Sequence, residues 1–123
     1  MVSNDINRQD FTIYNKILDY SSYVKQYVVV CIPNNHRNIR IHFLDELYML
    51  SKNMFYATYN KGSVRMKYLI EMQVNISLMD MMMNEIRTFS KVPKNNVDSA
   101  IKKLSNIKNI VYAWKLNEES KKK

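Results

Sequence analysis

The segment that decides the fold runs from residue 63 to residue 89 and reads SVRMKYLIEMQVNISLMDMMMNEIRTF. Its apolar side chains recur at alternating steps of three and four residues, which is the spacing of one face of an α-helix. The members of this series are Leu69, Met72, Ile76, Met79, Met83 and Ile86. The segment therefore predicts a long amphipathic helix that packs one face against neighbouring helices.

Three more segments show the same alternation, at residues 11–32, 38–59 and 96–116. The series of the first is Tyr14, Ile17, Ser21, Val24, Val28 and Cys31. The series of the second is Phe43, Leu47, Leu50, Met54 and Ala57. The series of the last is Val97, Ala100, Leu104, Ile107, Val111 and Trp114. We expect these side chains to form the core of four packed helices.

The breaks between the segments are short and contain the turn-forming residues of the chain. They fall at residues 33–35, 60–63 and 92–95, and Ser63 and Asn96 are candidate N-caps. Short connections between helices of about 20 residues favour an antiparallel up-down-up-down four-helix bundle. One glycine in 123 residues argues against β folds and glycine-rich phosphate loops. We predict an all-α chain: a flexible N-terminus at 1–10, the bundle at 11–116 and a charged flexible tail at 117–123.

The length of the chain fits one domain, and its hydrophobic content of 46% is ordinary for a folded domain. No run approaches the roughly 18 apolar residues of a membrane span, and residues 1–10 carry no signal-peptide core. A cytoplasmic protein without a membrane is therefore expected. The lone Cys31 lies in an apolar segment and is predicted to be a small buried hydrophobe.

The first two helices carry more apolar side chains than one buried stripe requires. The additional side chains are Ile13, Tyr20, Tyr23, Tyr27 and Val30 in the first helix, and Ile41, Leu44, Tyr48 and Phe55 in the second. Large exposed apolar patches usually mark interfaces, where tyrosine is common. We favour a homo-oligomer with Tyr20, Tyr23, Tyr27, Tyr48 and Phe55 at the interface. The alternative is a wide core face whose phenol groups reach water.

The net charge of +8 is unevenly distributed. Residues 1–85 hold nine basic and eight acidic groups, whereas residues 86–123 hold ten and three. Such an imbalance favours a nucleic acid partner, with a solvated lysine-rich surface as the alternative. The candidate contacts with nucleic acid or a polymerase are Arg37, Arg40, Arg65, Arg87, Lys102, Lys103, Lys108 and Lys115. Arg65 falls in a predicted first helical turn, where the helix dipole disfavours cations, so an external anion is expected there.

The chain offers few residues for catalysis or metal binding. His36, His42 and Cys31 do not form a plausible ligand set, so no metal or cofactor is expected. The adjacent carboxylates at 45–46 and 118–119 diverge on a helix, which favours solvated surface. Arg37 and His42 resemble the active motif of HEPN-domain ribonucleases, in which histidine transfers protons. In this chain the motif lies at the start of the second predicted helix, whereas in that family it lies near the start of the last core helix. A ribonuclease is therefore the third hypothesis.

Several short motifs follow one another over residues 11–116. They are Tyr14 with Ile17 and Leu18, Ile32-Pro33 followed by Arg37, Ala57 with Asn60, Arg65 with Tyr68, Leu69 and Glu71, and Ala113-Trp114-Lys115. In this order the chain resembles the accessory variability determinant (Avd-like) proteins of diversity-generating retroelements. It also resembles the wider group of bacterial four-helix bundles that includes proteins encoded in ribosomal RNA intervening sequences, although the small-residue stretch typical of that branch is not found.

The Avd-like resemblance implies a basic four-helix bundle that assembles into a homopentameric ring. It implies binding to the reverse transcriptase of the element and to its template RNA, in support of mutagenic cDNA synthesis, with no catalytic residues of its own. The alternative, implied by the wider group, is an RNA- or ribosome-associated bundle.

Overall fold

The computed structural model describes residues 8–121, and the side chains of residues 12–121. Over this range the chain forms four α-helices and no strand, which confirms the predicted all-α class. The helices are α1 (Arg8–Tyr27), α2 (Arg37–Thr58), α3 (Gly62–Ile86) and α4 (Lys94–Ser120), with the short 3₁₀ helices η2 (Val29–Cys31) and η3 (Asn34–His36) between α1 and α2.

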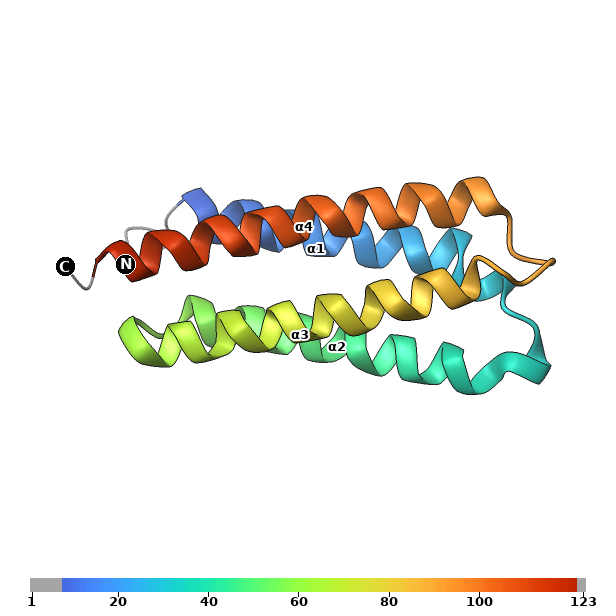
Figure 1. The fold of residues 1–123 in the computed structure, drawn as a ribbon, viewed down its shortest axis with the longest axis horizontal. Coiled ribbons are helices and arrows are strands. Elements are labelled where there is room, and N and C mark those ends of the chain that lie inside the picture. The colour runs from blue at the N-terminus through green and yellow to red at the C-terminus, as the bar shows by residue number, and fades with distance from the viewer. Residues whose placement is uncertain (1–7, 122–123) are drawn as a thin grey trace.

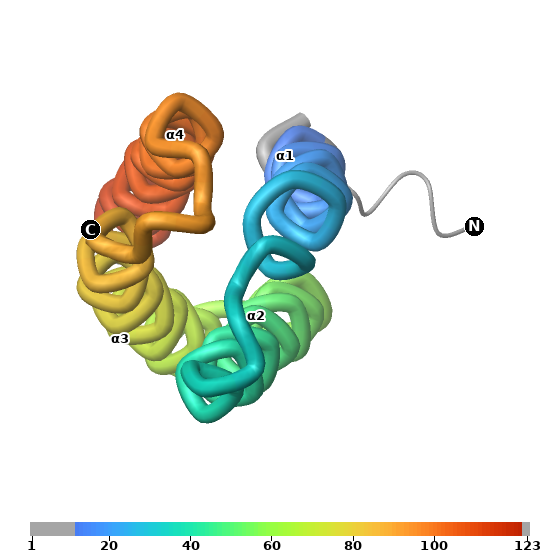
Figure 2. Tube along the Cα trace, turned by 90° about the vertical axis from the view of Figure 1, so that its right-hand side faces the viewer, coloured from blue at the N-terminus to red at the C-terminus, as the bar shows by residue number. Residues whose placement is uncertain are grey.

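The four helices lie side by side around one core. Figure 1 shows the α1–α2 and α3–α4 connections at one end and the α2–α3 connection at the other, so each helix runs back along the one before it. Each helix packs against the next, and α4 packs against α1. Figure 2 looks along the helices and shows the resulting order around the core, α1, α2, α3 and α4.

The predicted buried series of α2, α3 and α4 are confirmed, since every member of the three is buried. In α1 the prediction is partly wrong. Tyr14 is 42% exposed, whereas Ile13 and Tyr20 are fully buried. Two faces of α1 fit the helical spacing, one that includes Ile13 and Tyr20 and one that includes Tyr14. Packing against the other helices buries the face with Ile13 and Tyr20. Cys31, predicted to be buried, is half-buried beside the core.

The first helix ends five residues earlier than predicted, at Tyr27 rather than Ile32. Three consecutive β-branched residues follow, and Pro33 restricts the residue before it to extended backbone. Ile32 accordingly adopts φ −72° and ψ 123°. The segment between the helices turns as two 3₁₀ helices, so the chain reaches α2 without a long loop.

The predicted N-caps and the predicted C-terminal tail are also corrected. The α3 helix begins at Gly62, whose φ of 62° is in the left-handed region that favours glycine, so Ser63 lies inside the helix. The α4 helix begins at Lys94, and the Asn96 side chain instead donates a hydrogen bond of 3.1 Å to the Tyr27 carbonyl.

The predicted tail from 117 forms the last turn of α4 as far as Ser120. Residues 8–10 belong to α1, and residues 1–7 of the predicted flexible N-terminus lie outside the described range.

Buried amides join α2 to α3. Asn53 donates to the Asn75 side-chain oxygen at 2.8 Å, and Asn75 donates to the Glu46 carboxylate at 2.5 Å. Glu46, predicted to be solvated, is half-buried in this arrangement. Because these bonds form only in one alignment of the two helices, they specify how α2 and α3 pair.

Replacing Asn75 with leucine should lower the free energy of unfolding by about 1–3 kcal/mol, because Asn53 is 3% exposed and its amide would lose its acceptor. Urea unfolding followed by far-UV circular dichroism measures this loss. The double change Asn53→Leu with Asn75→Leu should recover part of it, since both buried amides are then removed. A single variant as stable as wild type would contradict this role.

Candidate nucleic-acid interface

The α1–α2 and α3–α4 connections meet at one end of the bundle. The His36 ring stacks on the Phe89 ring with 4.0 Å between centroids and an interplanar angle of 14°. The hydrogen bond from Asn96 to Tyr27 joins the start of α4 to the end of α1 close by. Figure 2 shows this end from the front, with both connections facing the viewer. Two segments far apart in the sequence therefore form one continuous surface.

This surface is rich in basic side chains. Residues 25–40 and 85–98 contribute six basic groups and two acidic ones. The basic groups are Lys25, Arg37, Arg40, Arg87, Lys91 and Lys94, and the acidic groups are Glu85 and Asp98. We call these residues, with His36 and Phe89, the basic end. Three side chains of the basic end are half-buried, namely Arg40, His36 and Phe89. Its other side chains are exposed.

The backbone at the basic end adds local donors. The α2 and α4 helices both begin here, and neither has a side-chain cap or an acidic residue in its first turn. The open N–H groups of a helix start favour anions. The α1 and α3 helices end here and present the opposite dipole, so the net positive charge of this end comes from its side chains.

Two of the predicted contact residues at the basic end are held by local partners. Arg40 donates to the Ile32 carbonyl and to the Asn34 side chain, each at 3.4 Å, and so supports the α1–α2 connection. Arg87 pairs with Asp98 at 2.7 Å, and its hydrogen bond holds the pKa of the Asp98 carboxyl below its usual range. Arg37 has no carboxylate within 4.0 Å among the described side chains. Arg37 is therefore the predicted contact that is most available here.

The predicted anion contact at Arg65 is wrong for this fold, because Arg65 is 5% exposed. Its guanidinium donates to the Glu118 carboxylate at 3.2 Å and to the Ala57 and Thr58 carbonyls at 2.7 and 3.2 Å. The other Glu118 oxygen accepts the Gly62 N–H at 2.9 Å. The anion that offsets this cation in the first turn of α3 is thus internal. We call Arg65, Glu118 and Gly62 the buried lock.

Glu118, predicted to be solvated, is 4% exposed in the lock. Burial by itself raises the pKa of its carboxyl, but the Gly62 hydrogen bond and the charges of Arg65 and Lys121 outweigh burial, so the pKa lies below its usual value. The Arg65 guanidinium also lies 5.3 Å from the centre of the Trp114 ring. The lock therefore ties the α2–α3 connection to the last turns of α4, at the end opposite the basic end (Figure 1).

The predicted lysine contacts of α4 do not share one face. Lys102 is exposed two residues from the buried Ala100 and Leu104, on the outer side of the helix. Lys103 lies toward α1, where it pairs with Asp19 at 3.1 Å and sits 5.2 Å from the Tyr23 ring centre. Lys115 is half-buried. These lysines raise the overall positive field but do not form a single binding stripe.

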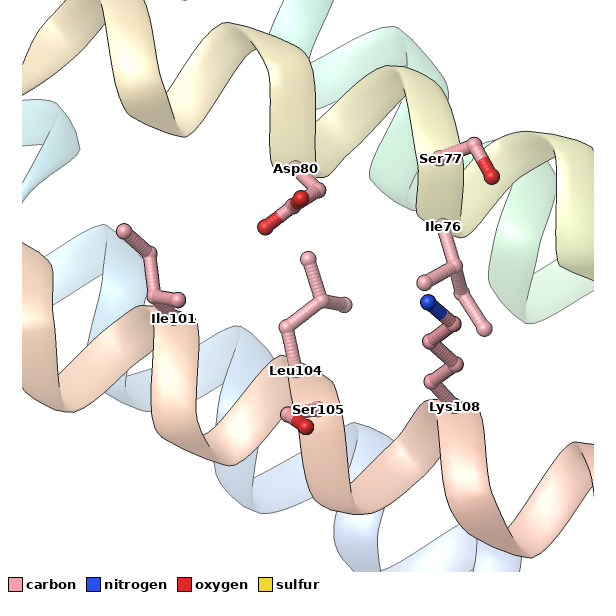
Figure 3. Close-up of a pocket in the computed structure, with 7 residues that line it drawn as sticks. All are labelled: Ile76, Ser77, Asp80, Ile101, Leu104, Ser105 and Lys108. Carbon is pink, nitrogen blue, oxygen red and sulfur yellow. The ribbon is translucent and has the colours of Figure 1, made fainter.

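Lys108 points toward α3 rather than outward. Figure 3 shows Lys108 of α4 and Asp80 of α3 reaching from opposite sides into a shallow pocket of about 330 Å³. The pocket is also lined by Ile76, Ser77, Ile101, Leu104 and Ser105. The Lys108 amine and the Asp80 carboxylate do not form an ion pair within 4.0 Å.

The five tyrosine and phenylalanine residues predicted at an oligomer interface lie in three different environments. Tyr20 is fully buried inside the subunit, which corrects its prediction; burial raises the pKa of its hydroxyl, with a smaller effect of Asp80. Tyr23 and Tyr27 contact each other at 5.0 Å on α1, with Tyr23 half-buried. Tyr48 and Phe55 are exposed on α2. Packing of α1 into the core places Tyr20 on the inner side.

An exposed aromatic patch surrounds Tyr48 and Phe55. The centroid of the Phe55 ring lies 6.1 Å from that of Tyr14 in α1. It lies 6.5 Å from that of Tyr59, on which the Phe55 ring stacks. A shallow groove of about 320 Å³ is lined here by Tyr48, Ser51, Lys52, Phe55, Tyr56 and Tyr59. Tyr48 and Phe55 in this patch, and Tyr27 on α1, are the members of the predicted interface that the structure leaves exposed.

The basic end includes three basic residues outside the predicted set of contacts, Lys25, Lys91 and Lys94. Their signal in the sequence was their position next to the two connections that share one end of an up-down bundle. Among residues 8–121, no cluster of three or more histidine, cysteine or acidic side chains is placed to hold a metal ion. In the same range, no helix has the length and apolar character needed to cross a bilayer.

Comparisons of the chain with protein-family models, with curated proteins and with solved structures found no match.

Proposed function

We propose that this protein is a non-catalytic accessory protein of a diversity-generating retroelement. In this role an antiparallel bundle, assembled as a ring-like homo-oligomer, binds the template RNA and the reverse transcriptase while mutagenic cDNA is made. The observation that carries the nucleic-acid part is the basic end, where six basic groups and two acidic groups surround two touching connections. The retroelement part rests on the order of motifs that resembles the Avd-like proteins, and that resemblance implies five subunits.

The basic end suits contact with a phosphate backbone. Flexible lysine and arginine side chains at a bundle end can follow phosphates without reading base edges, and such contacts are tolerant of sequence. The stacked His36 and Phe89 rings lie among them and offer an apolar surface to an unpaired base. Sequence-tolerant binding of single-stranded RNA is the form of recognition that this surface supports.

The exposed aromatic patch is the surface that we assign to assembly or to the polymerase. Tyr48 is 69% exposed and Phe55 44% exposed, and Tyr14 and Tyr59 extend the patch to either side. Aromatic rings with a polar tip are common at protein interfaces. The patch lies along α2, away from the basic end, so both surfaces can be occupied together.

The ribonuclease alternative receives less support from the geometry. Arg37 and His42 are five residues apart within α2, which separates their directions by about 140° around the helix axis. Both lie at the start of α2, whereas the motif of that family lies near the start of the last core helix. Cleavage of RNA that is lost in His42→Ala would favour this alternative.

The direct test of the nucleic-acid part is fluorescence anisotropy with a labelled single-stranded RNA of about 20 nucleotides at several salt concentrations. The triple change Arg37→Ala, Lys91→Ala and Lys94→Ala should weaken binding by about 10- to 100-fold at about 0.1 M salt, and should reduce the salt slope by about two units. The matched control removes three lysines outside the basic end and the aromatic patch, Lys16, Lys61 and Lys123.

The control variant has the same net charge as the test variant, so only the position of the charge differs. It should lose much less affinity than the test variant. Equal losses in the two variants would show that general charge rather than the basic end binds RNA. The retroelement part has a separate test, since a reverse transcriptase gene with paired template and variable repeats should lie beside the gene, and the two proteins should co-purify.

A further inference from the structure

The outer side of α3 carries an apolar stripe that no other described residue covers. Ile70, Val74, Leu78 and Met81 are 39–63% exposed and follow one another at helical spacing. With Gln73 and Ser77 they line a shallow groove of about 400 Å³. The opposite side of α3 is buried in the core, so this helix is apolar on two sides. A helix of that kind is typically covered on both sides.

The stripe has an opposite charge at each end. Lys67 lies one turn before Ile70, and Glu85 lies one turn after Met81. Both are exposed, and neither has an oppositely charged group within 4.0 Å among the described side chains. The Lys67 ammonium lies 5.3 Å from the ring centre of the adjacent Tyr68. At 100° per residue, Lys67, Val74 and Glu85 point in nearly the same direction.

Two pairs of residues on this surface are placed symmetrically about residue 76. Lys67 and Glu85 are each nine residues from it, and Val74 and Leu78 are each two residues from it. An antiparallel copy of the helix, related by a two-fold axis near residue 76, would therefore set Val74 against Leu78 of the partner subunit. It would also set Lys67 against Glu85 of the partner subunit, twice in each pair. A surface that complements itself in this way is the hallmark of an isologous contact.

We propose that the outer face of α3 binds a second copy of this chain, antiparallel, through the stripe and its two terminal charges. A parallel pair would place lysine against lysine and glutamate against glutamate. The antiparallel pair also directs the two basic ends away from each other. Over a 25-residue helix they are separated by roughly 37 Å, several times the screening length at physiological salt. Two chains that each carry a net charge of +8 can thus associate.

This contact is independent of the proposed function. The aromatic patch that we assign to assembly or to the polymerase lies on α2, and an α3 pair would join two chains or two rings. In either case the number of chains in the wild-type particle is even, and loss of the α3 contact halves it. The test is native mass spectrometry with sedimentation equilibrium of the full chain, from about 5 to 200 µM.

Val74→Glu should halve the mass of the particle and weaken the pair by more than about 100-fold, because two carboxylates would be buried at the contact. Its matched control is Tyr112→Glu on α4, since Tyr112 and Val74 are both 54% exposed. The control should keep the wild-type mass. Circular dichroism should show equal helix content in both variants, since neither side chain is in the core.

Charge reversal tests the antiparallel arrangement. Lys67→Glu and Glu85→Lys, made singly, should each weaken the pair by about 10-fold at low salt, and the double variant should return to within about 2-fold of wild type. Lys102→Glu is the control for a change of net charge. A particle with an odd number of chains that Val74→Glu leaves intact would overturn the proposal without touching the ring. A monomer at every concentration would overturn both the α3 pair and the ring. Failure of the double reversal to restore the pair would overturn the antiparallel arrangement.

Discussion

Replacing Arg65 with alanine should lower the free energy of unfolding by about 3–5 kcal/mol, because it leaves the buried Glu118 carboxylate without its cation. The same change removes the donors to the Ala57 and Thr58 carbonyls at the end of α2. Urea unfolding followed by the fluorescence of Trp114 measures the loss, since this is the one tryptophan in the sequence and it packs against Arg65.

The matched control is Arg87→Ala, which breaks the exposed pair with Asp98 at the other end of the molecule. Exposed pairs contribute little because water screens them. Unfolding midpoints of the two variants should therefore differ widely. If Arg65→Ala were as stable as Arg87→Ala, the buried lock would not hold the α2–α3 connection to α4.

The lock also makes stability depend on pH in a known direction. The pKa of the Glu118 carboxyl is lowered in the folded state, so the folded protein binds fewer protons there than the unfolded chain. The stabilisation of the fold by ionised Glu118 is complete above the ordinary carboxyl pKa of about 4.3. It is lost as the pH falls through the lower pKa that Glu118 has in the folded protein. The difference in stability between wild type and Glu118→Gln should shrink over that acid range. A difference that stays constant on acidification would count against an ionised Glu118.

Replacing Trp114 with alanine should also cost about 3–5 kcal/mol, because it is the largest side chain that is fully buried. Removing it leaves a cavity between α4 and the other helices and withdraws the ring that packs on Arg65. Circular dichroism in urea measures the change, since the variant has no tryptophan. Tyr112→Ala, on the exposed side of the same helix, is the control and should have a small effect.

Trp114 and Arg65 should be coupled in a double-mutant cycle. Because the two side chains touch, the loss in the double alanine variant should be smaller than the sum of the two single losses. Trp114→Phe should retain most of the stability, since it keeps most of the apolar volume. Additive losses would show that the ring and the guanidinium act independently.

Residue types alone could predict only part of the candidate site. The excess of basic residues was visible in the sequence, but which of them are available was not. Arg65 and Arg87 look alike as arginines near helix ends, yet one is buried beside Glu118 and the other is exposed beside Asp98. A pairing across 53 positions has no local signature, because it depends on where α4 passes the α2–α3 connection.

The same distinction applies to the aromatic residues of α1. The series through Tyr14 and the series through Tyr20 both fit a helix face, and no local interaction separates them. Contact with the remaining helices buries Tyr20 and leaves Tyr14 beside Phe55 at the surface. An interface role could therefore be assigned to Tyr48 and Phe55 from their exposure, but not to Tyr20.

Four helices, their approximate bounds and most of the core could be read from the order of residues, since a helix needs only local hydrogen bonds and a repeating apolar face. The buried pair of Arg65 and Glu118, the charged end made by two connections and the uncovered side of α3 required the packed chain. These features join residues that are distant in the sequence, and their energies depend on burial, which no short segment possesses before the helices come together.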